Sequence, residues 1–129
     1  MPGLDHKSPP LVVLVDDDID TRRIFSKFLG DEAIRVLSVG SAHECLQVLK
    51  GELVDLVLLD ILMPDMDGLS VLREIRANLR TAELPVVIIT ALDDRVVLVE
   101  AKRLGALGCL IKPISRRQLL SSVRAQIYS

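Results

Sequence analysis

The stretch Asp55-Leu-Val-Leu-Leu-Asp-Ile-Leu-Met-Pro-Asp-Met-Asp-Gly68 carries the pattern that decides the fold of this chain. Its apolar residues 56–59 run without polar alternation into Asp60, which predicts a strand buried on both faces, as in a parallel sheet. In open sheets of this kind, ligands bind in the crevice beyond the carboxyl ends of the strands. Asp60 is therefore expected to line such a crevice.

A strand pattern and then a helical pattern alternate five times along the chain, with short connections. This alternation predicts an α/β fold, with a doubly wound five-stranded parallel sheet flanked by five helices. Helical periodicity places Ile24 of the first helix and Leu79 of the third helix on inward faces. The second strand alternates weakly, which favours an edge position. The predicted strands cover 11–15, 34–39, 56–59, 86–89 and 108–111, and the predicted helices cover 19–29, 41–50, 67–79, 93–104 and 115–127.

The composition fits one domain over residues 11–129, preceded by a disordered tail at residues 1–10. Half of the 129 residues are apolar but only 2% are aromatic, so the core is expected to be aliphatic. Lys and Arg are scattered and the net charge is −2, which argues against direct nucleic-acid binding. No apolar run reaches the ~18 residues of a membrane span, and no signal-peptide core is present. We therefore expect a cytoplasmic protein without membrane contact.

The cysteines and the paired arginines suggest no separate site. Cys45 and Cys109 lack the spacing of a metal site, and we expect two reduced, mostly buried thiols. The pairs Arg22-Arg23 and Arg116-Arg117 are expected on solvated helix faces rather than around a phosphate.

Polar side chains follow four of the five predicted strands. Asp16 and Asp17 follow the first strand, and Asp60 follows the third. Thr90 and Lys112 follow the fourth and the fifth. In the doubly wound strand order 2-1-3-4-5, the first and third strands are neighbours at the switch point, so the three aspartates are expected to converge in one pocket.

Such a pocket requires positive charge. Three carboxylates about 5 Å apart repel by roughly 3 kcal/mol per pair at an effective dielectric of ~20. Lys112 supplies one cation, and a set of oxygen ligands without His or Cys suits Mg²⁺, which is often bound together with phosphate oxygens. The site therefore suits a phosphoryl group, with Thr90 and Lys112 as contacts and Asp60 as a nucleophile that forms an acyl phosphate.

Four motifs together resemble the receiver domain of two-component response regulators, in the CheY-like superfamily with its flavodoxin-like fold. The resemblance covers about residues 11–127, and the combination is far more specific than any single motif. The motifs are Val15-Asp-Asp-Asp18, Asp60-Ile-Leu-Met-Pro-Asp-Met-Asp-Gly68, Ile89-Thr-Ala91 and Lys112-Pro113.

The resemblance implies a role for each acidic residue. Asp60 would be the phosphoacceptor, and a histidine kinase or a histidine phosphotransfer protein would be the donor. Asp17, Asp60 and the backbone carbonyl of Leu62 would ligate Mg²⁺, and Asp16 would hold a metal-bound water. The chain would be a signalling switch rather than an enzyme with an external substrate, and would catalyse only phosphoryl uptake and loss at Asp60.

The resemblance also implies how the switch would respond. Thr90 and Lys112 would contact the phosphoryl group, and the Lys112–Pro113 peptide would be cis. The chain departs from the family at Cys109, where Tyr or Phe is usual, and at Ile114, where Phe is common. The aromatic relay is thus missing, and signalling would rely on shifts of loops and helices.

Apolar residues also stand two positions after Asp60 and after Thr90, at Leu62 and Leu92. In the resembled family these side chains tune the loss of the phosphoryl group. Apolar side chains cannot orient an attacking water, so we hypothesise a long-lived acyl phosphate.

The predicted fourth helix has more apolar residues than one inward stripe needs. The excess predicts either a broad buried face or an exposed patch for dimerisation or output. A homodimer could form through the face made by the fourth helix, the fifth strand and the fifth helix. The inward stripe is Val97, Ala101 and Leu104, and the additional apolar residues are Val96, Leu98 and Val99.

Three other functions remain as alternatives. A receiver-like interaction module that takes no phosphate would lack Asp60, Lys112 or the acidic pair, and all of these are present. Rossmann-like phosphatases and phosphotransferases carry a second Asp two residues after the nucleophile, where this chain has Leu62. A flavin site would need a Ser/Thr/Gly-rich loop after the first strand, where three aspartates stand instead.

Overall fold

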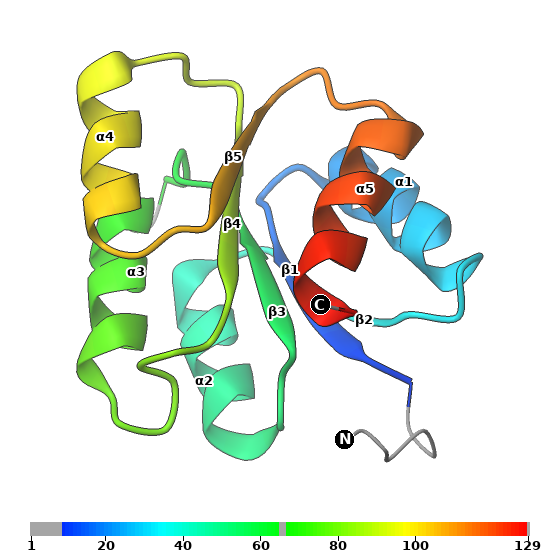
Figure 1. Cartoon of the computed structure of the whole chain (residues 1–129), viewed down its shortest axis with the longest axis horizontal. Coiled ribbons are helices and arrows are strands. Elements are labelled where there is room, and N and C mark those ends of the chain that lie inside the picture. The colour runs from blue at the N-terminus through cyan, green and yellow to red at the C-terminus, as the bar shows by residue number, and fades with distance from the viewer. Residues whose placement is uncertain (1–8, 65–66, 129) are drawn as a thin grey trace.

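The computed structural model describes residues 9–64 and 67–128, which form one five-stranded parallel sheet with helices on both faces. The strand order is β2-β1-β3-β4-β5, as predicted. Figure 1 shows α1 and α5 on one face of the sheet and α2, α3 and α4 on the other. The strands are β1 Leu11–Val15, β2 Arg35–Val39, β3 Leu56–Leu59, β4 Val86–Thr90 and β5 Gly108–Ile111, and the helices are α1 Ile19–Gly30, α2 Ala42–Gly51, α3 Gly68–Ala77, α4 Arg95–Arg103 and α5 Arg116–Ile127.

Strand burial follows position in the sheet. The central strands β1, β3 and β4 are buried along their whole length, which explains their unbroken apolar runs. The edge strands β2 and β5 are partly exposed, so the edge position predicted for β2 is correct. In the β1–β3 register Val15 lies opposite Leu59, and the residues that follow each of them therefore leave the sheet side by side.

An apolar core fills each side of the sheet. One core lies under α2, α3 and α4, and the other lies under α1 and α5. Both are almost entirely aliphatic, as the composition predicts, and full burial of each Leu, Ile or Val side chain contributes about 1.5–3 kcal/mol. The exception is the stacked pair Phe25 and Phe28, whose ring centroids lie 6.4 Å apart.

Three burial predictions are wrong. Leu79 is 95% exposed, because Asn78 adopts an extended conformation and ends α3 before it. Ile24 is half exposed, because the inward face of α1 is centred on Phe25 and Leu29. Cys45 is buried, and desolvation raises the pKa of its thiol to about 12, but Cys109 lies exposed on the edge strand β5. Both thiols are free.

Arg76 links α3 by hydrogen bonds to two other segments, at the end of the sheet where β4 begins. Its guanidinium donates to backbone carbonyls of the loop before β4 and of the turn after α4. Burial lowers its pKa, and among the described residues it has no carboxylate partner. Gly105 has a positive φ of 93°. Its lack of a side chain makes room for the Arg76 guanidinium, since a Cβ at this position would lie 2.7 Å from Arg76 Nε. The acceptors are Thr81, Ala82, Leu84, Leu104 and Gly105, at 2.8–3.3 Å.

Replacing Arg76 with methionine is expected to lower the free energy of unfolding by about 2–3 kcal/mol, because partly buried carbonyls lose their donor. Urea denaturation measures this change. Arg80→Met is the matched control, since Arg80 is exposed and donates to a single carbonyl, that of Lys50, at 2.9 Å. The control should stay within about 0.5 kcal/mol of the wild type. Equal losses in the two variants would contradict a special role for Arg76.

Candidate functional site

Three carboxylates meet at the carboxyl end of the sheet. Asp16 follows β1 and Asp60 follows β3, and their neighbours Val15 and Leu59 pair in the sheet. With Asp17, each offers one oxygen to a group in which all three oxygens lie within 4.8 Å of one another. Asp16 and Asp60 are buried, whereas Asp17 is exposed to solvent. The structure therefore brings together the three aspartates that the sequence predicted to converge.

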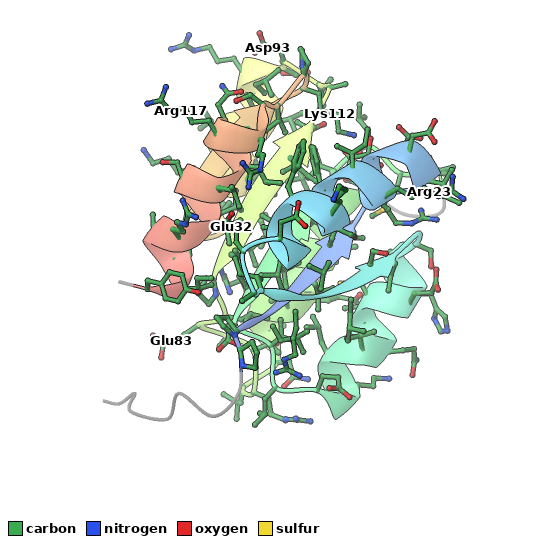
Figure 2. The ribbon with its side chains drawn as sticks, turned by 90° about the vertical axis from the view of Figure 1, so that its right-hand side faces the viewer. Arg23, Glu32, Glu83, Asp93, Lys112 and Arg117 are labelled. Atoms are coloured by element: carbon green, nitrogen blue, oxygen red, sulfur yellow. The ribbon has the colours of Figure 1, made fainter. Side chains whose placement is uncertain are left out.

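Lys112 bridges the two buried carboxylates. Its Nζ lies 2.7 Å from Asp16 Oδ2 and 3.1 Å from Asp60 Oδ2. Its backbone N–H donates to the carbonyl of Thr90 at 2.8 Å, and the following bond to Pro113 is cis, as expected. Figure 2 shows Lys112 at the end of the molecule opposite to Glu83, which precedes β4. The lysine thus lies where the carboxyl ends of the strands meet.

The second oxygen of each buried carboxylate is held by the backbone. Asp16 Oδ1 accepts from the N–H of Asp18 at 2.9 Å, and Asp60 Oδ1 accepts from the N–H of Leu62 at 2.9 Å. The Thr90 hydroxyl oxygen accepts from the N–H of Leu92 at 3.1 Å, and its side chain is fully buried. No buried side-chain nitrogen or oxygen within residues 9–64 and 67–128 lacks a hydrogen-bond partner. The buried polar groups of the site are therefore held in orientation by hydrogen bonds.

Burial and charge shift the pKa values of Asp60 and Lys112. Desolvation raises the pKa of Asp60, although the hydrogen bond from Leu62 and the charge of Lys112 oppose this shift. Burial alone would lower the pKa of Lys112, but its hydrogen bond to Asp16 and the charges of both carboxylates raise it overall. Lys112 is therefore fully charged at neutral pH.

The donor set fits a hard divalent cation. It offers only carboxylate oxygens, without imidazole or thiolate, and this favours Mg²⁺ over zinc or copper. Asp17 faces solvent, so a bound cation could retain several waters, as Mg²⁺ usually does. Lys112 already offsets part of the repulsion among the three carboxylates, and a divalent cation would offset more of it.

Of the four arginines predicted on solvated helix faces, Arg23, Arg116 and Arg117 are exposed as predicted, whereas Arg22 is only partly exposed. Arg22 Nη1 donates to the backbone carbonyl of Asp16 at 2.6 Å, so it lies beside the acidic pocket. Arg116 and Arg124 of α5 both bind the carboxylate of Glu32, which follows α1. Arg22 stands one helical turn after the helix cap Asp18, but this spacing alone does not show that its side chain reaches back over the strand end.

Cys109 lies where the resembled family usually has an aromatic ring. A hollow between α4 and β5 is present there, lined by Cys109 together with Ile88, Leu98 and Leu107. Although Cys109 is exposed, partial desolvation of its thiol and the charge of Asp93 raise the pKa of this group, so it is protonated at neutral pH. The small side chain of Cys109 thus borders a hollow at the position where the resembled family has the aromatic ring of its relay.

The structure is thus an α/β domain with a doubly wound parallel sheet, and three carboxylates and a lysine cluster at the carboxyl edge of that sheet. The family model of the response regulator receiver domain matches residues 12–124, and the chain belongs to this family. Within the described residues, none of the helices has both the length and the apolar character needed to cross a membrane.

Relatives and solved structures agree with this assignment. The transcriptional regulatory protein GltR of Pseudomonas aeruginosa is 37% identical over 114 residues, which are 88% of this chain and 47% of GltR. The CpxR homolog of Haemophilus influenzae is also 37% identical, over 88% of this chain and 48% of its own length. The chain thus spans about half the length of these curated relatives.

Among solved structures, a CheY-like receiver domain protein from Methanospirillum hungatei superposes with a TM-score of 0.89 at 25% identity, covering 94% of this chain and 95% of its own. The chemotaxis protein CheY4 of Vibrio cholerae has a TM-score of 0.87 at 26% identity, over 92% of this chain and 99% of its own. The likeness therefore covers the whole described fold.

Proposed function

We propose that Asp60 is the phosphoacceptor of this receiver domain. The observation that carries the proposal is the contact of Lys112 with both Asp60 and Asp16, beside the cluster of three carboxylates. Asp60 follows β3, which lies between β1 and β4, so the acidic pair after β1 is on one side of it and Thr90 is on the other. Asp60 therefore follows the strand between the one that ends at the acidic pair and the one that ends at Thr90, whereas Asp16 and Asp17 follow β1, which does not pair with β4.

The reaction is a direct transfer from a phosphohistidine. An oxygen of the Asp60 carboxylate attacks phosphorus, a new O–P bond forms, and the P–N bond to the donor imidazole breaks. The departing imidazole nitrogen keeps the electron pair and takes a proton from solvent. A histidine kinase or a histidine phosphotransfer protein would supply this phosphohistidine, and both are expected in the cytoplasm.

The residues around Asp60 suit the charge that this transfer brings into the pocket. Asp17, Asp60 and the backbone carbonyl of Leu62 would hold Mg²⁺, with Asp16 acting through a water molecule. The cation would neutralise negative charge on the phosphoryl oxygens. Lys112 would move its contact from the Asp60 carboxylate to a phosphoryl oxygen, and the Thr90 hydroxyl would donate to another.

Incubation with acetyl phosphate and Mg²⁺, followed by intact-mass measurement, tests the proposed function. The wild type should gain the mass of one phosphoryl group, and a chelator should prevent this gain. A protein that stays unmodified at saturating donor and Mg²⁺ would instead support an interaction module that takes no phosphate, which no present observation favours.

Once formed, the acyl phosphate is expected to persist well beyond minutes. Leu62 and Leu92 place no polar side-chain group near Asp60 or Thr90, so nothing at these positions can orient an attacking water. Release of inorganic phosphate after removal of the donor measures the lifetime. A Leu62→Asn variant should lose phosphate about tenfold faster, since an amide can position a water. Release within minutes from the wild type would contradict this prediction.

A homodimer through the face formed by α4, β5 and α5 is a further part of the proposal. Val96 and Val99 of α4 are 78% and 62% exposed, and Leu107 is also exposed. Leu98, which the sequence placed among the surplus apolar residues, packs partly against the core. Light scattering should show a doubled molar mass after phosphorylation in the wild type, but not in Val99→Glu. A wild type that stays monomeric in both states would contradict a dimer.

A further inference from the structure

Arg22 of α1 reaches the backbone at the edge of the acidic pocket. Its Nη1 donates to the carbonyl of Asp16 at 2.6 Å, six residues earlier in the chain. The N–H of Asp16 donates to the carbonyl of Val39 at 3.1 Å, and its Oδ1 accepts from the N–H of Asp18. Asp16 is therefore fixed through its N–H, its carbonyl and its carboxylate. The contact to the carbonyl comes from the side chain of Arg22 in α1, whereas the other two contacts are made by backbone groups.

Gly40 gives the guanidinium of Arg22 its position. A Cβ at Gly40 would lie 2.8 Å from Arg22 Nη1 and 3.3 Å from its Cζ. Gly40 follows β2, as Asp16 follows β1, and these two strands are paired. The guanidinium thus lies beside the carboxyl ends of both strands, so close to Gly40 that a Cβ there would force Arg22 Nη1 to shift.

Arg22 does not form an ion pair of the usual kind. Among the described residues, no carboxylate lies within 4.0 Å of its guanidinium, although three carboxylates form the pocket beside it. Its contact is with a peptide carbonyl, so its main effect should be on the backbone of the Asp16–Asp17 turn. Groups that orient the ligands of a metal typically change its affinity by about 10- to 100-fold.

We propose that Arg22 is a positioning residue that fixes the Asp16–Asp17 turn for the divalent cation, an inference that rests on the proposed function of the pocket. The contact of Arg22 is with the Asp16 carbonyl, so the proposed role acts through the backbone of Asp16 and Asp17. A purely electrostatic role of Arg22 predicts the opposite change in cation affinity when Arg22 is replaced. Loss of a positive charge beside three carboxylates would strengthen cation binding, whereas loss of the positioning contact weakens it.

Calorimetric titration of the full chain with Mg²⁺ tests the inference without reference to phosphorylation. Arg22→Met is expected to raise the dissociation constant by about 10- to 100-fold. Arg22→Lys keeps the charge but loses the planar donor, and should give a smaller increase. Arg23→Met is the matched control, because Arg23 is exposed at the outer edge of the molecule and should bind Mg²⁺ as the wild type does (Figure 2).

Gly40→Ala provides an independent test, since it displaces the guanidinium and leaves the charge of Arg22 in place. It should also weaken Mg²⁺ binding. The double variant Arg22→Met/Gly40→Ala should bind no more weakly than Arg22→Met, because both changes remove the same contact. The rate of phosphorylation by acetyl phosphate at saturating Mg²⁺ should change by less than about threefold in all of them, since no reacting group is lost.

The outcomes separate this inference from the function on which it rests. Unchanged or tighter Mg²⁺ binding in Arg22→Met, with a wild type that binds Mg²⁺ and is phosphorylated, would overturn the role of Arg22 alone. A wild type that binds no Mg²⁺ would overturn both. If melting curves show that Arg22→Met is unfolded, Arg22→Lys and Gly40→Ala decide the question, and normal binding in these two variants would overturn the inference.

Discussion

Asp60→Asn is expected to take up no phosphoryl group from acetyl phosphate at any Mg²⁺ concentration, because a carboxamide cannot act as the nucleophile. The amide keeps the size of the carboxylate, and its single oxygen can still accept the hydrogen bond from the N–H of Leu62, whereas its NH2 group cannot accept the bond that Asp60 Oδ2 accepts from Lys112. Intact-mass measurement should therefore show a folded and unmodified protein. Asp31→Asn, an exposed aspartate after α1, is the matched control and should be modified normally. Equal modification of Asp60→Asn and the wild type would exclude Asp60 as the acceptor.

The same variant should be more stable than the wild type at neutral pH when a chelator is present. Desolvation raises the pKa of Asp60 above its ordinary value of 3.8, so the folded state holds this proton at a higher pH than the unfolded state does. The free energy of unfolding of the wild type therefore loses a contribution as the pH rises through the folded pKa. The carboxamide of the variant does not titrate, so its advantage should shrink below that pKa and vanish below 3.8. A constant difference between urea midpoints across this range would contradict the raised pKa.

Lys112→Met should have the second largest effect. Removal of the ammonium group leaves Asp16 and Asp60 without their shared cation, whose Nζ lies 2.7 and 3.1 Å away. Phosphorylation by acetyl phosphate should slow by about 100- to 1,000-fold, since a preorganised charge at the phosphoryl oxygens is lost. The free energy of unfolding in chelator should fall by up to about 3 kcal/mol, because two buried carboxylates then face each other uncompensated.

Added Mg²⁺ should restore part of the stability of Lys112→Met, since the cation also offsets the carboxylates. Lys50→Met, which removes an exposed lysine of α2, should match the wild type in both rate and stability. If Lys112→Met were phosphorylated at the wild-type rate, the contact between Lys112 and the carboxylates would have no part in the transfer.

The sequence was sufficient to predict the sheet and the convergence of the acidic residues. The unbroken apolar runs of β1, β3 and β4 reflect burial on both faces, and this requires helices on each side. Once the strand order is known, the residues after neighbouring strands must meet, as Asp16 and Asp60 do through the Val15–Leu59 pair. These features depend on periodicity and connectivity, which the sequence carries directly.

Other features could not be predicted from periodicity, because they depend on the positions of long side chains, on helix ends and on the exposure of an edge strand. Arg22 reaches the Asp16 carbonyl and Arg76 reaches five carbonyls, and neither contact follows from helical periodicity. Leu79 lies outside the core because α3 ends at Ala77, and helix ends are set by local hydrogen bonds that periodicity does not resolve. The exposure of Cys109 follows from the position of β5 at the edge of the sheet.

The identity of the phosphorylated residue tests the central claim most directly. Borohydride reduces an acyl phosphate, but not a free carboxylate, to an alcohol, so a phosphorylated aspartate is recovered as homoserine. After treatment with acetyl phosphate and Mg²⁺, peptide mass spectrometry of the reduced protein should find homoserine at position 60, and none when donor or Mg²⁺ is omitted. Homoserine at position 16 or 17 instead, or at no position, would contradict the assignment of Asp60 as the phosphoacceptor.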